Sequence, residues 1–146
     1  MKILVLNGPN LNMLGRREAE HYGSLSLDQI NQRLDELAPG LGLDLGFAQS
    51  NHEGELVDIL QGAAPEYAGV ALNAGGYTHT SVALRDAVLC CGVPVVEVHL
   101  SQPAAREEFR HHSYLTGACA GSVAGFGWRS YALALHWFAM LQGDEQ

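Results

Sequence analysis

The chain has 146 residues, of which 47% are hydrophobic and 16% are charged, and 17 are glycines. This length and composition suit one catalytic domain, residues 1–146, with a sizeable core, and they exclude a disordered or fibrous chain. The net charge of −8 argues against nucleic acid and against an anionic membrane as partners, so an anionic small molecule would need a local basic site.

Short apolar segments alternate along the chain with segments of helical periodicity. Ser26 and Gln29 have capping-box spacing at the start of one helix, and Ser50 and Glu53 have the same spacing at the start of the next. We therefore predict, in chain order, a strand at 2–7, a helix at 26–39, a strand at 43–47, a helix from 50 to 63, a strand at 69–72, a helix from 78 to 92, a strand at 94–98, a short helix at 102–110, a strand at 121–126 and a terminal helix at 129–141.

Strands that alternate with helices indicate a parallel sheet with helices on both faces. Five such units in a chain of this length predict the flavodoxin-like, doubly wound α/β architecture with five parallel strands. In such sheets the carboxyl ends of the strands meet at one edge, and ligands bind there. The first predicted strand ends at Asn7-Gly8-Pro9-Asn10, so we expect this loop to lie at that edge.

Polar side chains gather directly after the predicted strands, more densely than loops require. Taken singly, each has a simpler interpretation: asparagines favour turns, a lone tyrosine is usually half-buried, and His52 and His79 suit helix starts. His111 and His112 are adjacent and face different ways on a helix, so we interpret them as structural or interfacial residues. The whole group comprises Asn7, Asn10, Asn12, Arg17, Tyr22, Gln49, Ser50, Asn51, His52, Glu53, Asn73, Tyr77, His79, Glu97, His99, Ser101, Gln102, Arg106 and Arg110.

Two pairs in this group suit proton transfer. Tyr22 follows Arg17 by five residues, and a phenol serves as a base only where a fixed cation lowers its pKa. Glu97 and His99 are two residues apart on a predicted strand, so they point to the same face. A carboxylate beside a histidine orients the imidazole and favours its protonated form, which suits a proton donor, although such pairs also occur as inert surface features.

Several other chemistries lack the residues that they need. The chain contains no GxGxxG, GxxxxGK[ST], GxSxG or HExxH motif, and Cys90, Cys91 and Cys119 do not have metal-site spacing, so we predict no cofactor and no metal. The only lysine, Lys2, begins the first strand at the end opposite the expected site, which argues against imine catalysis. We interpret the three cysteines as buried thiols in a reducing compartment, and with no secretory or membrane-spanning pattern this predicts a cytoplasmic location.

Five segments, in order and spread over nearly the whole chain, resemble one family, type II 3-dehydroquinate dehydratase. They are NGPNLNMLGRRE with HYGSLSL (7–27), FAQSNHEGEL (47–56), NAGGYTHTSVALRDA (73–87), VEVHLSQPAAREEFRHHSYL (96–115) and GFG (125–127). The resemblance implies a homo-oligomer, a dodecamer built from trimers of flavodoxin-like subunits. It also implies a hydro-lyase without a Schiff base: anti elimination of water from 3-dehydroquinate, through an enolate, gives 3-dehydroshikimate in the shikimate pathway to chorismate and aromatic amino acids.

The same resemblance implies roles for individual residues. The family's base falls on Tyr22, activated by Arg17, with Arg106 as a second cation. The proton donor falls on His99, which Glu97 orients. The loop between residues 11 and 22 is expected to close over the substrate. The remaining matches are Asn10, which polarises a water at the enolate, Asp86, which reaches the site of a neighbouring subunit, and the substrate contacts Asn73, His79, Leu100, Ser101 and Arg110.

Two other classes of function stay open as alternatives. One is a flavodoxin-like module that binds a nucleotide or flavin without this activity, and the lack of a phosphate-binding loop speaks against it. The other is a binding or scaffold homologue that keeps the fold but not the chemistry. The presence of Tyr22, Arg17 and His99 speaks against that alternative.

Overall fold

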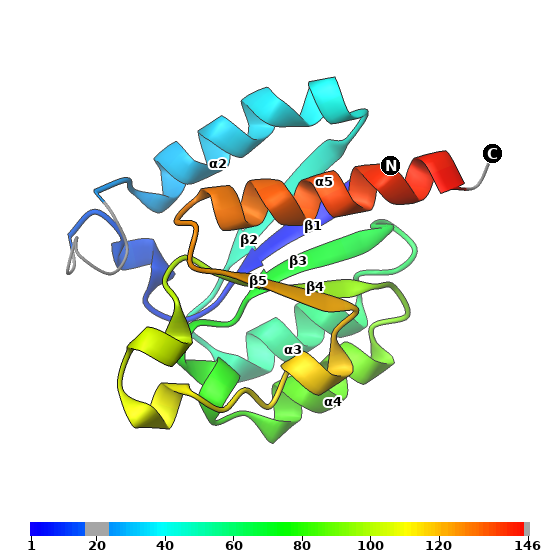
Figure 1. Cartoon of the computed structure of the whole chain (residues 1–146). Coiled ribbons are helices and arrows are strands. Elements are labelled where there is room, and N and C mark those ends of the chain that lie inside the picture. Colours follow the sequence, from blue (N-terminus) through cyan, green and yellow to red (C-terminus); the bar gives the residue numbers. More distant parts are fainter. Residues whose placement is uncertain (17–23, 145–146) are drawn as a thin grey trace.

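A computed structural model of the chain describes residues 1–16 and 24–144. The described residues form a five-stranded sheet in the order β2-β1-β3-β4-β5, in which every neighbouring pair is parallel (Figure 1). The order changes direction between β1 and β3, and this switch point is where doubly wound sheets bind ligands. The strands are β1 (Lys2–Asn7), β2 (Asp44–Gln49), β3 (Gly69–Asn73), β4 (Val95–His99) and β5 (Gly121–Ala124).

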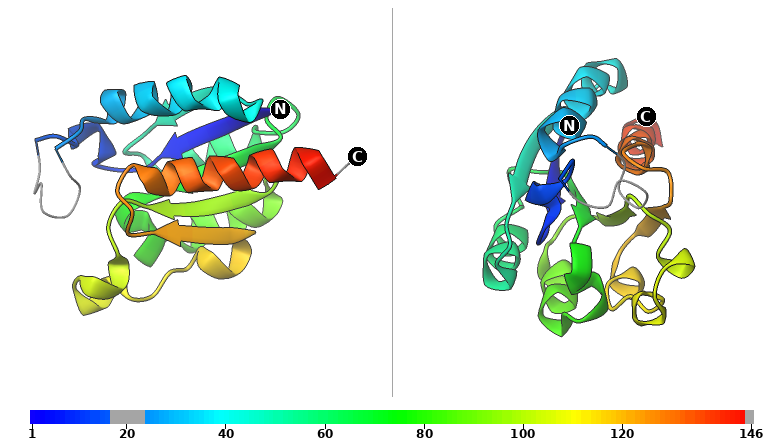
Figure 2. Two further views of the ribbon diagram at one scale, coloured as in Figure 1. Left: turned by 45° about the horizontal axis from the view of Figure 1, so that its top comes forward. Right: turned by 90° about the vertical axis from the view of Figure 1, so that its left-hand side faces the viewer.

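Helices cover both faces of the sheet, which confirms the predicted fold class. α2 (Leu27–Leu37) and α5 (Arg129–Asp144) lie on one face, and α3 (Glu53–Gln61) and α4 (Val82–Cys90) lie on the other (Figures 1 and 2). None of the helices in the described ranges is long and apolar enough to cross a membrane. Short 3-10 helices complete the connections: η1 (Leu11–Met13), η2 (Ala38–Leu41), η3 (Gly75–His79), η4 (Pro103–Ala105), η5 (Glu108–Arg110) and η6 (Thr116–Ala118).

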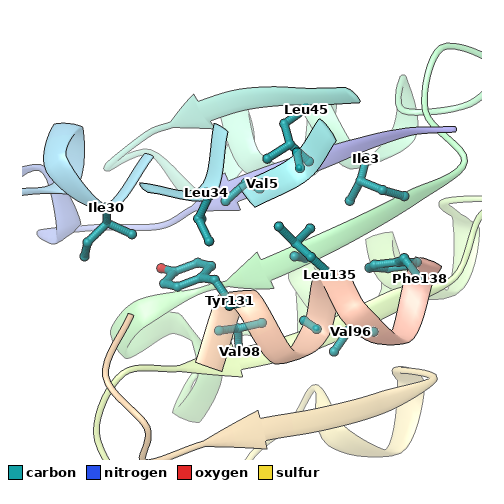
Figure 3. Packing of buried hydrophobic residues seen from close by; sticks show 14 of the residues in the cluster. Ile3, Val5, Ile30, Leu34, Leu45, Val96, Val98, Tyr131, Leu135 and Phe138 are labelled. Atoms are coloured by element: carbon teal, nitrogen blue, oxygen red, sulfur yellow. The ribbon is translucent and has the colours of Figure 1, made fainter. Parts of the chain in front are cut away.

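Strand β1 shows how the sheet separates two hydrophobic cores. Ile3 and Val5 belong to the cluster under α2 and α5, which Figure 3 shows from close by. Leu4 and Leu6 belong to the cluster under α3 and α4. Successive side chains of a strand point to opposite faces, so a strand that is covered on both sides must be apolar at every position. This is why the predicted strands are continuous apolar runs instead of alternating ones.

One of the two predicted helix caps is confirmed and the other is wrong. At α2 the Ser26 hydroxyl accepts the Gln29 N–H (3.1 Å), and the Gln29 side chain accepts the Ser26 N–H (2.9 Å), as in a capping box. At α3 the helix begins one residue after His52, whose side chain makes no capping hydrogen bond. The Ser50 hydroxyl instead donates to Glu55 (2.6 Å) and accepts the N–H of His52 (3.0 Å). Spacing alone therefore misplaced the start of this helix.

The predicted helix at 102–110 is also wrong. The segment forms two separate 3-10 helices, η4 and η5, because Arg106 between them is extended, with φ −106° and ψ −162°. This break turns the Arg106 side chain inward, where it is only 8% exposed. Other ends differ as well: the helix predicted from residue 78 begins at Val82, because residues 75–79 form η3, and the strand predicted to residue 126 ends at Ala124. α2 stops at Leu37 and passes into η2, and α5 continues beyond the predicted end at residue 141.

Candidate active site

The loops after β1 and β3 approach each other closely at the switch point. The Gly8 N–H donates to the carbonyl oxygen of Asn73 (2.7 Å), and a Cβ atom on Gly8 would lie 2.5 Å from the carbonyl oxygen of Ala74. Gly75 has a φ of +57°, and a Cβ atom there would lie 2.9 Å from the carbonyl oxygen of Pro9. Only glycine fits both positions, and the two backbones can therefore line one cavity together.

This cavity, of about 130 Å³, lies at the carboxyl ends of β1, β3 and β4. Two arginines and two histidines line it, and no carboxylate does so within the described residues. The cavity is thus a local basic site in a chain whose net charge is −8, as an anionic small molecule requires. Eight of the predicted site residues line it: Asn10, Asn73, His79, His99, Leu100, Ser101, Arg106 and Arg110.

Of the other four predicted site residues, the two that the structure describes, Glu97 and Asp86, do not line this cavity. Glu97 lies behind His99, to which it is hydrogen-bonded. Asp86 is exposed on α4 and is not among the lining residues. Tyr22 and Arg17 lie outside the described residues, so their predicted roles as base and activator stay predictions.

The histidine and carboxylate of β4 form a tight pair. His99 Nε2 lies 2.5 Å from Glu97 Oε2, and the Glu97 side chain is only 3% exposed. Burial disfavours the charged carboxylate, but hydrogen bonds from His99, Thr116 and Ser113 outweigh it and hold the pKa of Glu97 below its ordinary value of 4.5. An ionised carboxylate only accepts, so Nε2 carries a proton in this pair. Nδ1 is then the nitrogen of His99 that is left for the cavity.

His79 faces His99 and behaves differently. The two rings stack, with centroids 6.4 Å apart and planes at 19°. His79 Nδ1 lies 2.8 Å from the carbonyl oxygen of His112, which can only accept, so Nδ1 carries the proton and Nε2 is free to accept. Burial, together with the nearby Arg110 and His99, lowers the pKa of His79 below 6.5. The neutral ring is therefore suited to accept a hydrogen bond from a ligand hydroxyl.

A fully buried tyrosine of α5 holds the amide of Asn73. The Asn73 amide nitrogen donates to the Tyr131 hydroxyl (2.9 Å), which in turn donates to the side-chain oxygen of Asn7. The Asn73 side-chain oxygen accepts the N–H of Gly75 (3.1 Å). Figure 3 shows the Tyr131 hydroxyl directed toward the carboxyl ends of the strands. One amide N–H of Asn73 stays unused by these contacts at the wall of the cavity.

Backbone geometry and arginine contacts fix the rest of the cavity wall. Asn10 has a φ of 67°, the left-handed conformation that asparagine tolerates better than most residues, and its N–H donates to the Asn51 side chain (2.9 Å). Arg110 donates to Glu107 (2.7 Å), and Arg106 approaches the Ser101 hydroxyl at 3.4 Å. The arginine side chains are therefore positioned by protein contacts before any ligand binds.

Four residues that support the site were not predicted from the sequence. Tyr131 had a usable signal: a tyrosine on the buried face of an apolar helix needs a hydrogen-bond partner for its hydroxyl. Asn51 was noted only as one of the polar residues after a strand. Ser113 and Thr116, which donate to Glu97, carried no signal, because hydroxyl side chains are common in loops.

The arrangement offers general acid chemistry next to an anion-binding wall. A buried carboxylate–histidine pair can deliver a proton into the cavity, and the arginines and amides can hold a negatively charged, hydroxylated ligand. Lys2, the only lysine, lies at the far end of β1 and contacts Glu66 (2.8 Å), as the sequence predicted for its position. Within residues 1–16 and 24–144, no group of three or more His, Cys, Asp or Glu side chains is placed to hold a metal ion.

Comparisons with known proteins show the family of this chain. The family model "Dehydroquinase class II" matches residues 1–139. A 3-dehydroquinate dehydratase of an Exiguobacterium species is 56% identical over 136 residues, which are 93% of this chain and 92% of the relative. Another, from Roseiflexus castenholzii, is 50% identical over 144 residues, 99% of this chain and 92% of the relative.

Solved structures give the same result. The type II dehydroquinase from Propionibacterium acnes has a TM-score of 0.92 at 42% identity and covers 95% of this chain and 96% of its own. The type II dehydroquinase from Butyrivibrio crossotus has a TM-score of 0.91 at 40% identity, with 94% and 96% covered. On sequence and fold together, this chain belongs to the class II dehydroquinase family.

Proposed function

We propose that this chain is a type II 3-dehydroquinate dehydratase, a hydro-lyase that converts 3-dehydroquinate to 3-dehydroshikimate and water in the shikimate pathway. The observation that carries the proposal is the Glu97–His99 pair at a basic cavity in a chain of this family. The family match does not favour a flavin- or nucleotide-binding module, the alternative on sequence grounds. The position of Lys2 supports a mechanism without a Schiff base.

In the first chemical step a base removes a proton from the carbon next to the ketone. The C–H electron pair becomes the carbon–carbon double bond of an enolate, and negative charge moves to the ketone oxygen. The base is Tyr22, and Arg17 is the cation that makes its phenol acidic enough to ionise. Asn10, at the cavity wall, holds a water that donates a hydrogen bond to the enolate oxygen.

In the second step the enolate reforms the ketone and expels the β-hydroxyl group. The C–O bond breaks, its electron pair leaves with the oxygen, and a proton from His99 turns hydroxide into water. Nδ1 of His99 supplies this proton while Nε2 keeps its hydrogen bond to Glu97. Each turnover therefore leaves one proton on the base and takes one from the acid, so both are restored by exchange with solvent.

Contacts to the carboxylate and hydroxyl groups of the substrate determine how it is oriented in the cavity. Leu100 and Ser101 follow β4 and offer backbone N–H groups, and Asn73, whose second amide N–H is not used in the contacts above, lines the same cavity. Arg110 and neutral His79 suit the ring hydroxyls. These groups form the carboxylate and hydroxyl subsites of the proposed enzyme.

The complete site includes a second subunit. Asp86 is exposed on α4 of its own subunit and lines no part of its own cavity, which is consistent with its reaching a neighbouring copy. The assembly proposed is a dodecamer of trimers. A cytoplasmic location is supported by the free thiols of Cys90, Cys91 and Cys119, of which Cys90 is exposed and not buried as predicted.

The direct test is an ultraviolet assay with 3-dehydroquinate that follows the conjugated enone of dehydroshikimate. Activity is expected, and it should survive treatment with borohydride in the presence of substrate, since no imine forms. Loss of activity only when substrate is present during reduction would establish an imine and refute this mechanism. No activity from the assembled protein would refute the proposed function itself.

The variant Tyr22→Phe tests the base assignment. We expect turnover to fall by about a thousandfold or more, because the ring is retained and the group that takes the proton is lost. Substrate binding, measured by calorimetry, should change little. Tyr114→Phe is the matched control, because Tyr114 is exposed and its hydroxyl has no hydrogen-bond partner among the described residues. Turnover near that of the control would refute the role of Tyr22.

A further inference from the structure

Two hydroxyl groups converge on the carboxylate behind the proton donor. The Thr116 hydroxyl, on η6, donates to Glu97 Oε1 (2.7 Å). The Ser113 hydroxyl lies 3.1 Å from both Glu97 oxygens. His99 is the third donor and Glu97 is only 2% exposed, so histidine and hydroxyl donors of the described residues satisfy this carboxylate without an arginine or lysine among the contacts named.

The direction of the Ser113 hydroxyl is fixed by its own backbone. Its oxygen accepts the N–H of Leu115 (3.0 Å) and the N–H of Thr116 (3.2 Å). Both lone pairs of this oxygen are then occupied, and its proton can point only to Glu97. The turn that precedes η6 is thus built to present one donor to this carboxylate.

We propose that Ser113 and Thr116 are positioning residues of the dehydratase, which keep Glu97 anionic and aligned so that His99 can act as the proton donor. This inference rests on the proposed function and goes beyond it, because neither hydroxyl reaches the cavity where the substrate binds. They act on the reaction through Glu97.

Neutral donors suit this task better than a cation would. A hydroxyl stabilises the carboxylate by hydrogen bonding and leaves its full negative charge to attract the imidazolium of His99. An arginine in the same place would stabilise the carboxylate equally but would cancel that attraction. The hydroxyl donors also oppose transfer of the shared proton from His99 to Glu97, which would leave the pair neutral.

Removing a hydroxyl donor should shift the pKa of Glu97 in one direction. The hydroxyls lower the pKa of Glu97, so their loss raises it, and the carboxylate then takes up a proton at a higher pH. A protonated Glu97 donates as well as accepts, so it no longer fixes the orientation of the His99 ring, and activity is lost at a higher pH on the acidic side of the profile. The other charged or titratable groups around the pair, unchanged in these variants, are His79 of η3, Arg106, Arg110 of η5, His111 and Cys119.

The test compares kcat and KM from pH 4 to 9 for the variants Thr116→Val and Ser113→Ala. We expect kcat at neutral pH to fall by about threefold to tenfold, KM to stay within about twofold, and the acidic limb of kcat to move up by about one pH unit. Thr116→Ser, which restores a hydroxyl, should recover both quantities.

Thr78→Val is the matched control for a buried threonine that loses its hydroxyl. Thr78 lies close by, is 0% exposed, and its hydroxyl has no hydrogen-bond partner among the described residues. We expect an unchanged pH profile. If the acidic limb of the kcat profile moves by the same amount in Thr78→Val, the effect is structural and the inference is overturned.

A second measurement uses the Glu97→Gln background. If the hydroxyls act through the carboxylate, Thr116→Val should lower kcat no further there, whereas independent effects would add. If Thr116→Val fails to fold, Ser113→Ala removes the other donor and decides the question. Wild-type protein that is inactive on 3-dehydroquinate overturns the proposed function, and active wild type with unchanged variants overturns the positioning role alone.

Discussion

The end of β4 and the ends of β1 and β3 support the same cavity with opposite kinds of network. At β4 the partners are ionisable: Glu97 is held anionic and hydrogen-bonded to His99. At β1 and β3 the partners are neutral: Tyr131 links the amides of Asn7 and Asn73, and burial raises its pKa, so its phenol stays protonated. Both networks are buried, so their difference is one of charge and not of exposure.

This difference separates two tasks of an active site. A neutral network cannot gain or lose a proton near neutral pH, so it can only fix where a side chain points. A carboxylate–histidine pair can change its protonation during turnover, so it can take part in the reaction. We therefore expect damage at β4 to appear in kcat and its pH dependence, and damage at β1 and β3 to appear in KM and stability.

The largest effect should come from removing the proton donor with His99→Gln. Loss of a general acid typically costs about a hundredfold to ten-thousandfold in rate, so kcat should fall by that amount while KM changes little. His136→Gln is a matched control, because His136 is exposed on α5, away from the cavity. A His99→Gln variant that keeps its kcat and loses only affinity would show that the β4 network serves binding.

An intermediate effect should come from Tyr131→Phe, which breaks the neutral network. The side-chain oxygen of Asn7 and an amide N–H of Asn73 would be left buried without their partner, at a cost of about 1–3 kcal/mol in the free energy of unfolding. Because the amide of Asn73 is then held only by the N–H of Gly75, KM should rise by about threefold to tenfold, with kcat nearly unchanged. Denaturant unfolding and steady-state kinetics measure the two quantities.

The exposed Tyr114→Phe is the control for this variant, and it should change neither quantity. If Tyr131→Phe lowered kcat with no change in KM, the neutral network would be part of the chemical step, and the separation of tasks between the two networks would fail.

The sequence predicted the charged network better than the neutral one. Glu97 and His99 are two residues apart on one strand, so alternation alone places them on the same face. Asn7, Asn73 and Tyr131 lie in three separate elements, and Tyr131 is 124 residues from Asn7, so local pattern could not join them. The same limit explains why Ser113 and Thr116 were missed: their turn reaches Glu97 across 16 and 19 residues.

The fold itself was predictable because its signals are local and repeated. Each strand of the sheet was found from its apolar run, and the capping box at Ser26 was found from spacing. The errors arose where tertiary contacts compete with local pattern. Ser50 donates to Glu55 instead of capping α3, and the extended backbone of Arg106 interrupts what spacing suggested was one helix.

The smallest expected effect is the pH dependence of the free energy of unfolding. It tests whether the network at β4 is charged, as the comparison with β1 and β3 requires. The pKa of His79 in the folded chain lies below 6.5, so the unfolded chain binds this proton more readily, and stability falls as pH drops below about 6.5. The pKa of Glu97 lies below 4.5, so its contribution is complete above about 4.5 and is lost as pH falls through the folded value.

The free energies of unfolding of wild type, His79→Gln and Glu97→Gln, measured between pH 3 and 8, should therefore show two separate pH ranges, one in which His79 changes its contribution and one in which Glu97 does. The difference between wild type and His79→Gln should change only below about pH 6.5, and slightly, because His79 is partly exposed and solvent screens it. The difference between wild type and Glu97→Gln should change below about pH 4.5, where the carboxylate of the folded chain takes up its proton. A Glu97 carboxyl carbon NMR resonance that titrates near pH 6 in wild type would mean that the carboxylate is protonated there, and the pair at β4 would then be a neutral network like that at β1 and β3.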